Sequence, residues 1–189
     1  MTEAFERACR EFAAVHAADP AGAASRYHAT LARWVDTLVP AAPVALRLAA
    51  RCQHLGRHTI PRSAYPEGLA GYKRWRAAAA LEHARRAAEV VRDAGFDVAV
   101  AERVGELLIK KGLRSDPEVQ AFEDAICLTF LETDFPAFAA KHPDDKVIDI
   151  LQKTWRKMSP RGHGAALDLA KRLEPGLTAL LERALGADP

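Results

Sequence analysis

Apolar residues recur along this chain every three or four positions, which is the spacing of one face of an α-helix. In residues 2–17 that face comprises Phe5, Ala8, Cys9, Phe12 and Val15. Glycine, proline and capping residues separate the periodic segments. The pattern predicts eight or nine helices, at about 2–17, 25–38, 44–56, 72–94, 97–111, 116–135 and 144–158, with two short helices between 163 and 185.

The segment 57–70 interrupts this pattern with Pro61, Pro66 and Gly68. A loop of this length inside a compact domain is usually functional or disordered. Its composition is not of low complexity, and proline stiffens both itself and the residue before it. We therefore expect an ordered loop that folds over the end of helix 44–56 and presents Arg62 towards His54.

One predicted helix is apolar on nearly every side, because residues 125–131 read AICLTFL. A helix of this kind belongs in the centre of a bundle, and Pro136 is expected to break or kink it. The chain has 39 alanines among 189 residues, and alanine favours helices over strands. These features predict a single all-α domain over 1–189, with a core at about 25–160 and closing helices at 163–185.

The overall charge is nearly balanced, with 27 Lys and Arg against 25 Asp and Glu. This balance is not typical of proteins that bind nucleic acid through a strongly basic surface. The N-terminus has no signal-peptide pattern, and no apolar run approaches the length of a membrane span. The three cysteines, Cys9, Cys52 and Cys127, form no CxxC pair. Together these features predict reduced thiols and a cytoplasmic protein without a membrane partner.

The basic residues are concentrated in the middle of the chain. Residues 47–76 hold seven basic side chains and one acid, a net charge of +6. Arginine makes bidentate contacts to phosphate and carboxylate groups, and aromatic residues among arginines stack on planar ligands. The predicted binding residues for a phosphorylated molecule are Arg51, Arg57, Arg62, Tyr65, Trp75, Lys153 and Lys157. The alternative is a solvated helix face with local ion pairs.

Three inward-facing polar residues form a candidate metal site: His54, His83 and Asp124. His54 lies beside the buried face of helix 44–56, His83 shares a stripe with small apolar residues, and Asp124 lies in the buried helix. A buried carboxylate must be paired, hydrogen-bonded or bound to a metal. Taken singly, each residue is more often a hydrogen-bonded core histidine or a paired acid. Taken together, from three helices, they predict one divalent transition metal.

Three segments resemble elements of the HD superfamily of metal-dependent phosphohydrolases: LAARCQHLGRH at 48–58, LEHARRAAEVV at 81–91 and VQAFEDAICLTFLE at 119–132. The resemblance implies an HD-like helical core that holds a metal at the three residues named above. The chain departs from the superfamily at Leu55, where the HD motif has an aspartate, and at Lys110 and Lys111, near which a further histidine is expected. These departures imply the loss of a two-metal site.

More closely, nearly the whole chain, from about Phe5 to Leu185, resembles a family of bacterial and fungal proteins catalogued as domain of unknown function 4202. The motifs that carry this resemblance are AARCQHLGRHTIPRSAYP, GYKRWR, DPEVQAFEDAICLTFLE and KTWRKMSPRGH. They are long and specific, but the family implies no activity.

The sequence supports two functions. In the first, the protein is an HD-like metal-dependent hydrolase of a nucleotide or another phosphorylated small molecule. The metal would activate water, and Glu123 or His58 would act as acid or base. In the second, the same scaffold binds an anionic metabolite or RNA through its basic loop without turnover, which the missing aspartate favours. The sequence indicates no oligomeric state.

Overall fold

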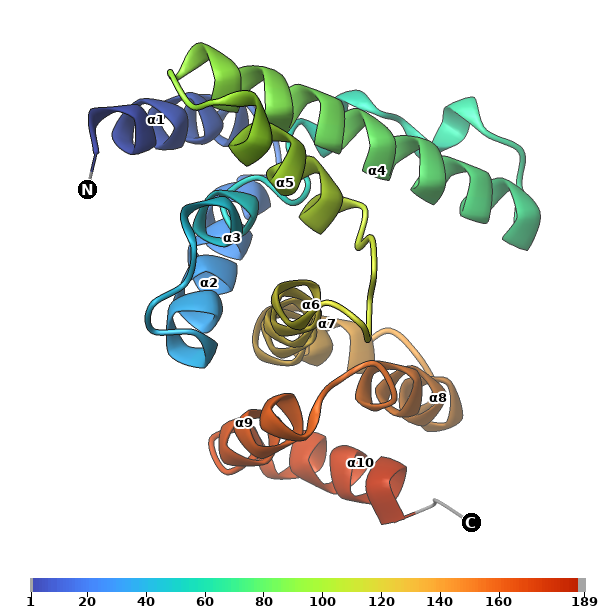
Figure 1. The fold of residues 1–189 in the computed structure, drawn as a ribbon. Helices are drawn as coiled ribbons and strands as arrows, with labels where there is room; N and C mark the ends of the chain where they lie inside the picture. The colour runs from blue at the N-terminus through green and yellow to red at the C-terminus, as the bar shows by residue number, and fades with distance from the viewer. Residues whose placement is uncertain (1, 187–189) are drawn as a thin grey trace.

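The computed structural model describes residues 2–186, and this part of the chain consists of helices joined by turns (Figure 1). Its ten α-helices are α1 (Glu3–Ala17), α2 (Ala23–Leu38), α3 (Val44–Ala49), α4 (Gly68–Asp93), α5 (Val98–Leu108), α6 (Pro117–Thr129), α7 (Phe135–Ala139), α8 (Asp144–Trp155), α9 (Pro160–Ala170) and α10 (Pro175–Gly186). Two short 3₁₀ turns, η1 (Arg57–Thr59) and η2 (Arg62–Ala64), precede α4, and a π-helical segment η3 (Phe130–Asp134) joins α6 to α7. The predicted all-α fold is confirmed.

Helix α6 lies in the middle of the molecule (Figure 1). It packs against α2, α5 and α9. Helices α4 and α5 pair along one side of it, with α1 against α4, and α8 pairs with α10 on the other side. The polar residues of α6 are therefore placed between two groups of helices.

The central position of α6 follows from its sequence. Val119, Phe122, Ala125 and Leu128 are completely buried. The same hydrophobic core contains the large side chains of Phe12, Leu31, Leu46, Leu107 and Leu151. Burial of one such side chain contributes roughly 1.5–3 kcal/mol, so the core fixes α6 and the acids that it carries.

The third helix is shorter than predicted. Helix α3 ends at Ala49, and residues 50–56 continue as tight turns in which backbone N–H groups donate three residues back. Cys52 and Leu55 remain buried, because these turns keep them on the inner side. His54 therefore lies on a turn and not on a helix.

The end of α6 is a widened turn and not a break. In η3 the backbone hydrogen bonds span five residues, and the chain then continues directly into α7. Pro136 lacks an N–H group and cannot continue an α-helical ladder, and the wider turn accommodates it. Such π segments often occur near functional sites.

The loop of residues 57–67 is ordered and runs along α4 (Figure 1). The indole N–H of Trp75 on α4 donates to the carbonyl of Ile60 over 3.0 Å. Gly71 permits the close approach, because a Cβ atom there would lie 1.7 Å from the carbonyl oxygen of Pro66. The loop is therefore held by α4.

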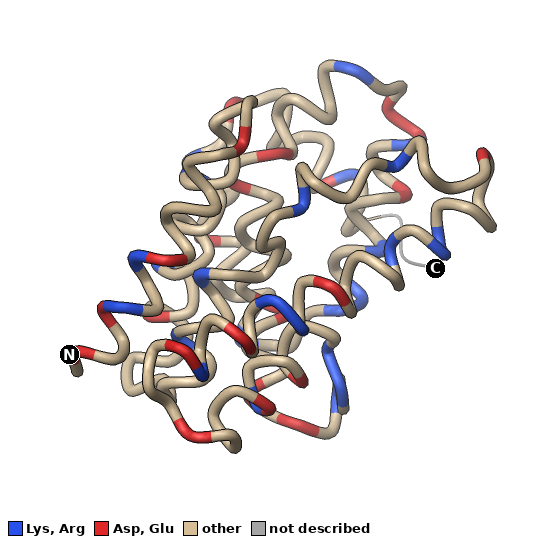
Figure 2. Tube along the Cα trace, turned by 90° about the horizontal axis from the view of Figure 1, so that it is seen from above, with Lys and Arg blue, Asp and Glu red and all other residues tan. Residues whose placement is uncertain are grey.

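Acidic and basic positions are interspersed along most of the trace (Figure 2). Many of them form surface ion pairs within one helix, such as that between Lys153 and Asp149. In the part of the chain that the structure describes, no helix is long and apolar enough to cross a membrane.

Candidate functional site

Two pockets meet at the turn that carries His54. The first, of about 290 Å³, lies between this turn, α4 and the end of α5. The second, of about 480 Å³, lies between the turn, the start of α2 and η3. We name them the cationic pocket, lined by Arg57, Trp75, Arg76, His83 and Lys110, and the histidine pocket, lined by His16, Tyr27, His28, His58 and Asp134. His54 and Arg57 line both pockets and form the wall between them.

The histidines of the two pockets form one chain of contacts. The ring of His16 stacks on that of His28, with 3.8 Å between centroids. His28 donates from Nδ1 to the carbonyl of Ala24 over 2.7 Å and accepts at Nε2 from the backbone N–H of His54 over 3.3 Å. These two bonds fix the neutral tautomer of His28. The ring of His54 in turn lies 5.7 Å from that of His83.

Burial keeps these histidines neutral. It lowers the pKa of His28 to about 3, and neighbouring His16 contributes to the shift. Burial, followed by the charge of Arg57, lowers the pKa of His54 well below its usual range and that of His83 to about 4. The positive charge of the cationic pocket at neutral pH therefore comes from arginine and lysine.

One polar atom at the cationic pocket has no partner. Nε2 of His83 is buried and forms no hydrogen bond among the described residues, and the side chain is 3% exposed. His83 faces inward because it lies on the same stripe of α4 as the buried Ala79 and Ala87. A buried polar group without a partner costs roughly 1–3 kcal/mol. A ligand that hydrogen-bonds to Nε2 would recover this free energy.

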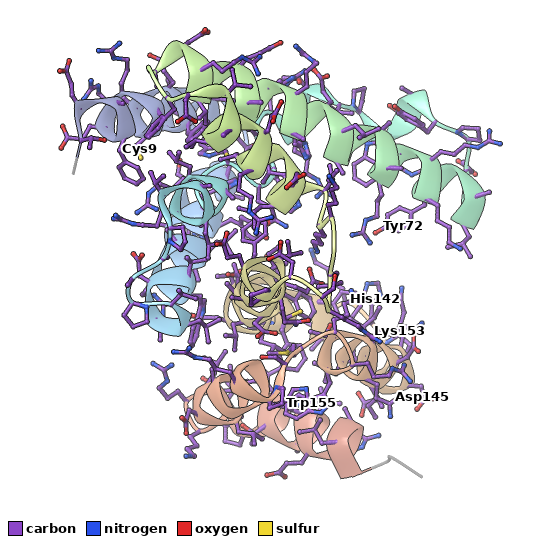
Figure 3. The ribbon with its side chains drawn as sticks, viewed as in Figure 1. Cys9, Tyr72, His142, Asp145, Lys153 and Trp155 are labelled. Carbon is purple, nitrogen blue, oxygen red and sulfur yellow. The ribbon has the colours of Figure 1, made fainter. Side chains whose placement is uncertain are left out.

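Two arginines of the cationic pocket lie against aromatic rings. The guanidinium of Arg57 lies 4.8 Å from the ring centroid of Trp75, and that of Arg76 lies 5.8 Å from Tyr72. Neither arginine forms an ion pair within residues 2–186. The ring of Tyr72 is 42% exposed and projects from the N-terminal half of α4 (Figure 3). Both guanidinium groups are thus available to an anion.

The third cation of this pocket is Lys110, which follows α5. Its ammonium pairs with the carboxylate of Glu123 on α6, and the Glu123 side chain is 3% exposed. Among the described residues, no acid lines the pocket itself. The predicted acid or base Glu123 therefore lies behind Lys110, whereas His58, the other candidate, is exposed and lines the histidine pocket.

Asp124 does not join the two histidines of the predicted metal set. Its carboxylate accepts hydrogen bonds from the backbone N–H and the hydroxyl of Ser159, over 2.8 and 2.5 Å, and from the amide of Gln120 over 3.1 Å. Ser159 is the N-cap of α9. Successive residues on a helix point about 100° apart, so Asp124 faces α9 while its neighbour Glu123 faces Lys110.

The side chains around the histidine pair do not fit a divalent metal. Nε2 of His54 accepts the N–H of Arg57 over 3.3 Å. The carboxylate of Asp124 is hydrogen-bonded to Ser159 in the turn before α9. The ammonium of Lys110 would repel a second cation. Within the described range, no three His, Cys, Asp or Glu residues are grouped so that they could hold a metal ion. The three-residue set that the sequence predicted is not assembled.

The loop residues among the predicted binding side chains have different roles. Arg57 and Trp75 line the cationic pocket. Arg62 does not point towards His54, because its guanidinium donates to the carbonyls of Tyr65 and Gly68 over 2.8 and 3.4 Å. Arg62 thereby supplies donors to one carbonyl group of the loop and to one at the start of α4. Arg62 and the half-buried Tyr65 therefore shape the loop.

The remaining predicted binding residues lie elsewhere. Arg51 lines a separate pocket between α1 and α2, with its guanidinium over the ring of Phe5. Lys153 lies on α8, clearly apart from α4 in Figure 3, and pairs with Asp149 over 2.6 Å. Lys157 is exposed after the end of α8. Neither Lys153 nor Lys157 lines the cationic pocket, so the two basic segments do not form one site there.

Sequence reasoning assigned no binding role to several residues of this region, among them Tyr27, Gln53, Arg76 and Lys110. The Tyr27 hydroxyl donates to the amide oxygen of Gln53, and its ring stacks on that of His54 at 5.3 Å. Burial raises the pKa of Tyr27, so the hydroxyl stays a donor. A signal for Arg76 was present, because it lies one turn after Tyr72 on a predicted helix, but the helical pattern does not show which basic residues share a pocket.

The comparison with known proteins gives one result. The family model described as a domain of unknown function, DUF4202, matches residues 6–181. No curated protein and no solved structure is significantly similar to the chain. The match runs from α1 into α10 and contains the two pockets with every residue that lines them. This chain belongs to the DUF4202 family.

Proposed function

We propose that the protein binds a small phosphate-bearing molecule in the cationic pocket. The observation that carries this proposal is the placement of Arg57, Arg76 and Lys110 around the unpartnered Nε2 of His83. Guanidinium groups bind phosphate oxygens bidentately. A neutral histidine can add a hydrogen bond without adding charge. Several donors of different geometry therefore converge on one small volume.

The dimensions of the pocket favour a small ligand. Its volume of about 290 Å³ lies just below the range of roughly 300–1,000 Å³ for ligand pockets. A phosphate group with a small organic part fits this volume, whereas single-stranded RNA needs an extended groove. Partial burial also strengthens ion pairing, since the effective dielectric constant falls away from bulk water.

Metal-dependent hydrolysis, the activity that the HD resemblance implies, has less support. Nε2 of His54 is occupied by Arg57, and Asp124 is hydrogen-bonded to Ser159. The ammonium of Lys110 at the same pocket also opposes a metal. The proposal is therefore one of ligand binding and includes no turnover.

Calorimetric titration with four probes tests the proposal: inorganic phosphate, pyrophosphate, a pentose phosphate and adenosine monophosphate. We expect the protein to bind at least one of them. Arg76→Gln should weaken that binding about tenfold, which corresponds to the loss of one charge-assisted hydrogen bond.

The matched control is Arg74→Gln, because Arg74 is exposed on the same helix and does not line the pocket. This variant should bind the probes as the wild type does. If the wild type binds none of the four probes, or if both variants lose affinity equally, the pocket is not a phosphate site.

A further inference from the structure

Lys110 occupies a backbone position that favours glycine. It follows the C-cap residue of α5, has a φ of +58°, and donates its N–H to the carbonyl of Leu107 over 3.0 Å. Many helices end in such a left-handed residue, most often glycine. A residue with a Cβ atom loses roughly 1–2 kcal/mol in this conformation. We therefore expect the side chain of Lys110 to form an interaction that compensates for this strain and that glycine could not form.

The partner of Lys110 is an acid enclosed in the core. The side chain of Glu123 on the central helix α6 is 3% exposed, and the Lys110 ammonium is its ion-pair partner. Taking a carboxylate out of water costs several kcal/mol unless it is paired. The Lys110 side chain is 26% exposed and lines the cationic pocket. One end of the pair is therefore sealed, and the other is open to a ligand.

We propose that Lys110, held by Glu123, is the built-in cation of the anion site, and that the pocket binds its oxyanion without a divalent metal ion. This inference rests on the function proposed above. The buried carboxylate holds the ammonium in place, so no lysine conformations need to be ordered when the anion binds. The side chain reaches from the end of α5 to Glu123 on α6. A metal ion would meet the same need, but the side chains present do not fit one.

A purely structural pair is the competing explanation, and a double substitution separates the two. Lys110→Gly combined with Glu123→Gln relieves the backbone strain and removes the acid that would lose its partner. We expect this variant to unfold at or above the wild-type temperature and to bind the phosphate probes at least tenfold more weakly. Lys110→Gln alone, in which an amide still faces Glu123, should show the same loss of affinity.

The matched control is Lys111→Gln. Lys111 is the adjacent residue, is exposed, and pairs with Glu106 over 2.6 Å. It should leave the affinity unchanged. A second arm repeats the wild-type titration after dialysis against EDTA, and we expect the same affinity as before.

The outcomes distinguish the two proposals. A folded Lys110→Gly/Glu123→Gln variant, or a Lys110→Gln variant, that binds phosphate as tightly as the wild type shows that the pair is structural. Loss of phosphate binding in EDTA shows that a metal holds the anion. Either result overturns this inference while the phosphate site stands. A wild type that binds none of the four probes overturns the proposed function and this inference with it.

Discussion

Glu123 and Asp124 are consecutive acids on α6, each 2% exposed, and they serve two very different regions of the molecule. On the side of α9, Asp124 accepts hydrogen bonds from Ser159 and Gln120. On the side of α5, Glu123 meets the ammonium of Lys110. Beyond that ammonium lies a pocket with an unpartnered histidine nitrogen. One region is closed by its own hydrogen bonds, and the other is open to a ligand.

The difference shows which feature of a buried polar group indicates a ligand site. Both side chains are carboxylates, and they are equally buried. What differs is whether the chain itself supplies all the partners. A fully satisfied carboxylate stabilises the fold and needs nothing further. Polar groups that face a pocket without a partner lower the stability of the free protein and gain free energy when a ligand arrives.

The largest expected effect follows from removing the hydrogen bonds of the closed region. Asp124→Ala leaves the backbone N–H and the hydroxyl of Ser159 without their acceptor and removes one of the two acceptors of the Gln120 amide. It should lower the free energy of unfolding by about 3 kcal/mol. Urea unfolding at neutral pH measures it. The control is Asp168→Ala, which removes an exposed acid of α9 paired with Lys171 and should change stability by less than about 0.5 kcal/mol. Equal effects would mean that the Asp124 cluster is not structural.

A second expected effect concerns the open region, where His83 makes the free energy of unfolding depend on pH. The pKa of His83 falls from an ordinary 6.5 to about 4 on folding, so the unfolded chain binds the proton more tightly. The resulting stability is present above pH 6.5 and is lost as the pH falls towards 4. Between pH 7.5 and 5 this loss is about 2 kcal/mol. Urea unfolding measures the effect. Over the same pH range, the free energy of unfolding of His83→Gln should fall by about 2 kcal/mol less than that of the wild type. The same pH dependence in both proteins would contradict the buried neutral His83.

The smallest expected effect again concerns the closed region. In Gly162→Ala the new Cβ atom would lie 2.7 Å from Cγ of Asp124, a side chain that three hydrogen bonds hold in place. We expect a loss of roughly 1–2 kcal/mol. Gly164→Ala on the same helix has nothing within 4 Å and should be neutral or stabilising. Thermal unfolding of the two variants compares them directly. A neutral Gly162→Ala would show that the Asp124 cluster adapts easily.

Much of the fold could be predicted from the sequence. Helical periodicity located nearly all the helices, and the unbroken apolar run at 125–131 indicated the buried α6. The inward stripe of α4 correctly placed His83 away from water. The predicted end of the third helix, at about residue 56, was wrong, because three-residue turns bury Cys52 and Leu55 just as a longer helix would. Apolar spacing alone does not distinguish the two.

The sequence by itself determined which residues face inward, and the tertiary structure decided which of them meet. His54 and His83 come together, whereas Asp124 turns to α9 and its neighbour Glu123 takes the side of Lys110. The physical reason is that a helix buried on every side has no polar face, so its sequence pattern does not indicate how it is rotated about its axis. Its rotation is set by the packing of α2, α5 and α9 around it. A rotation of one residue, about 100°, decides which acid pairs with Lys110 behind the pocket.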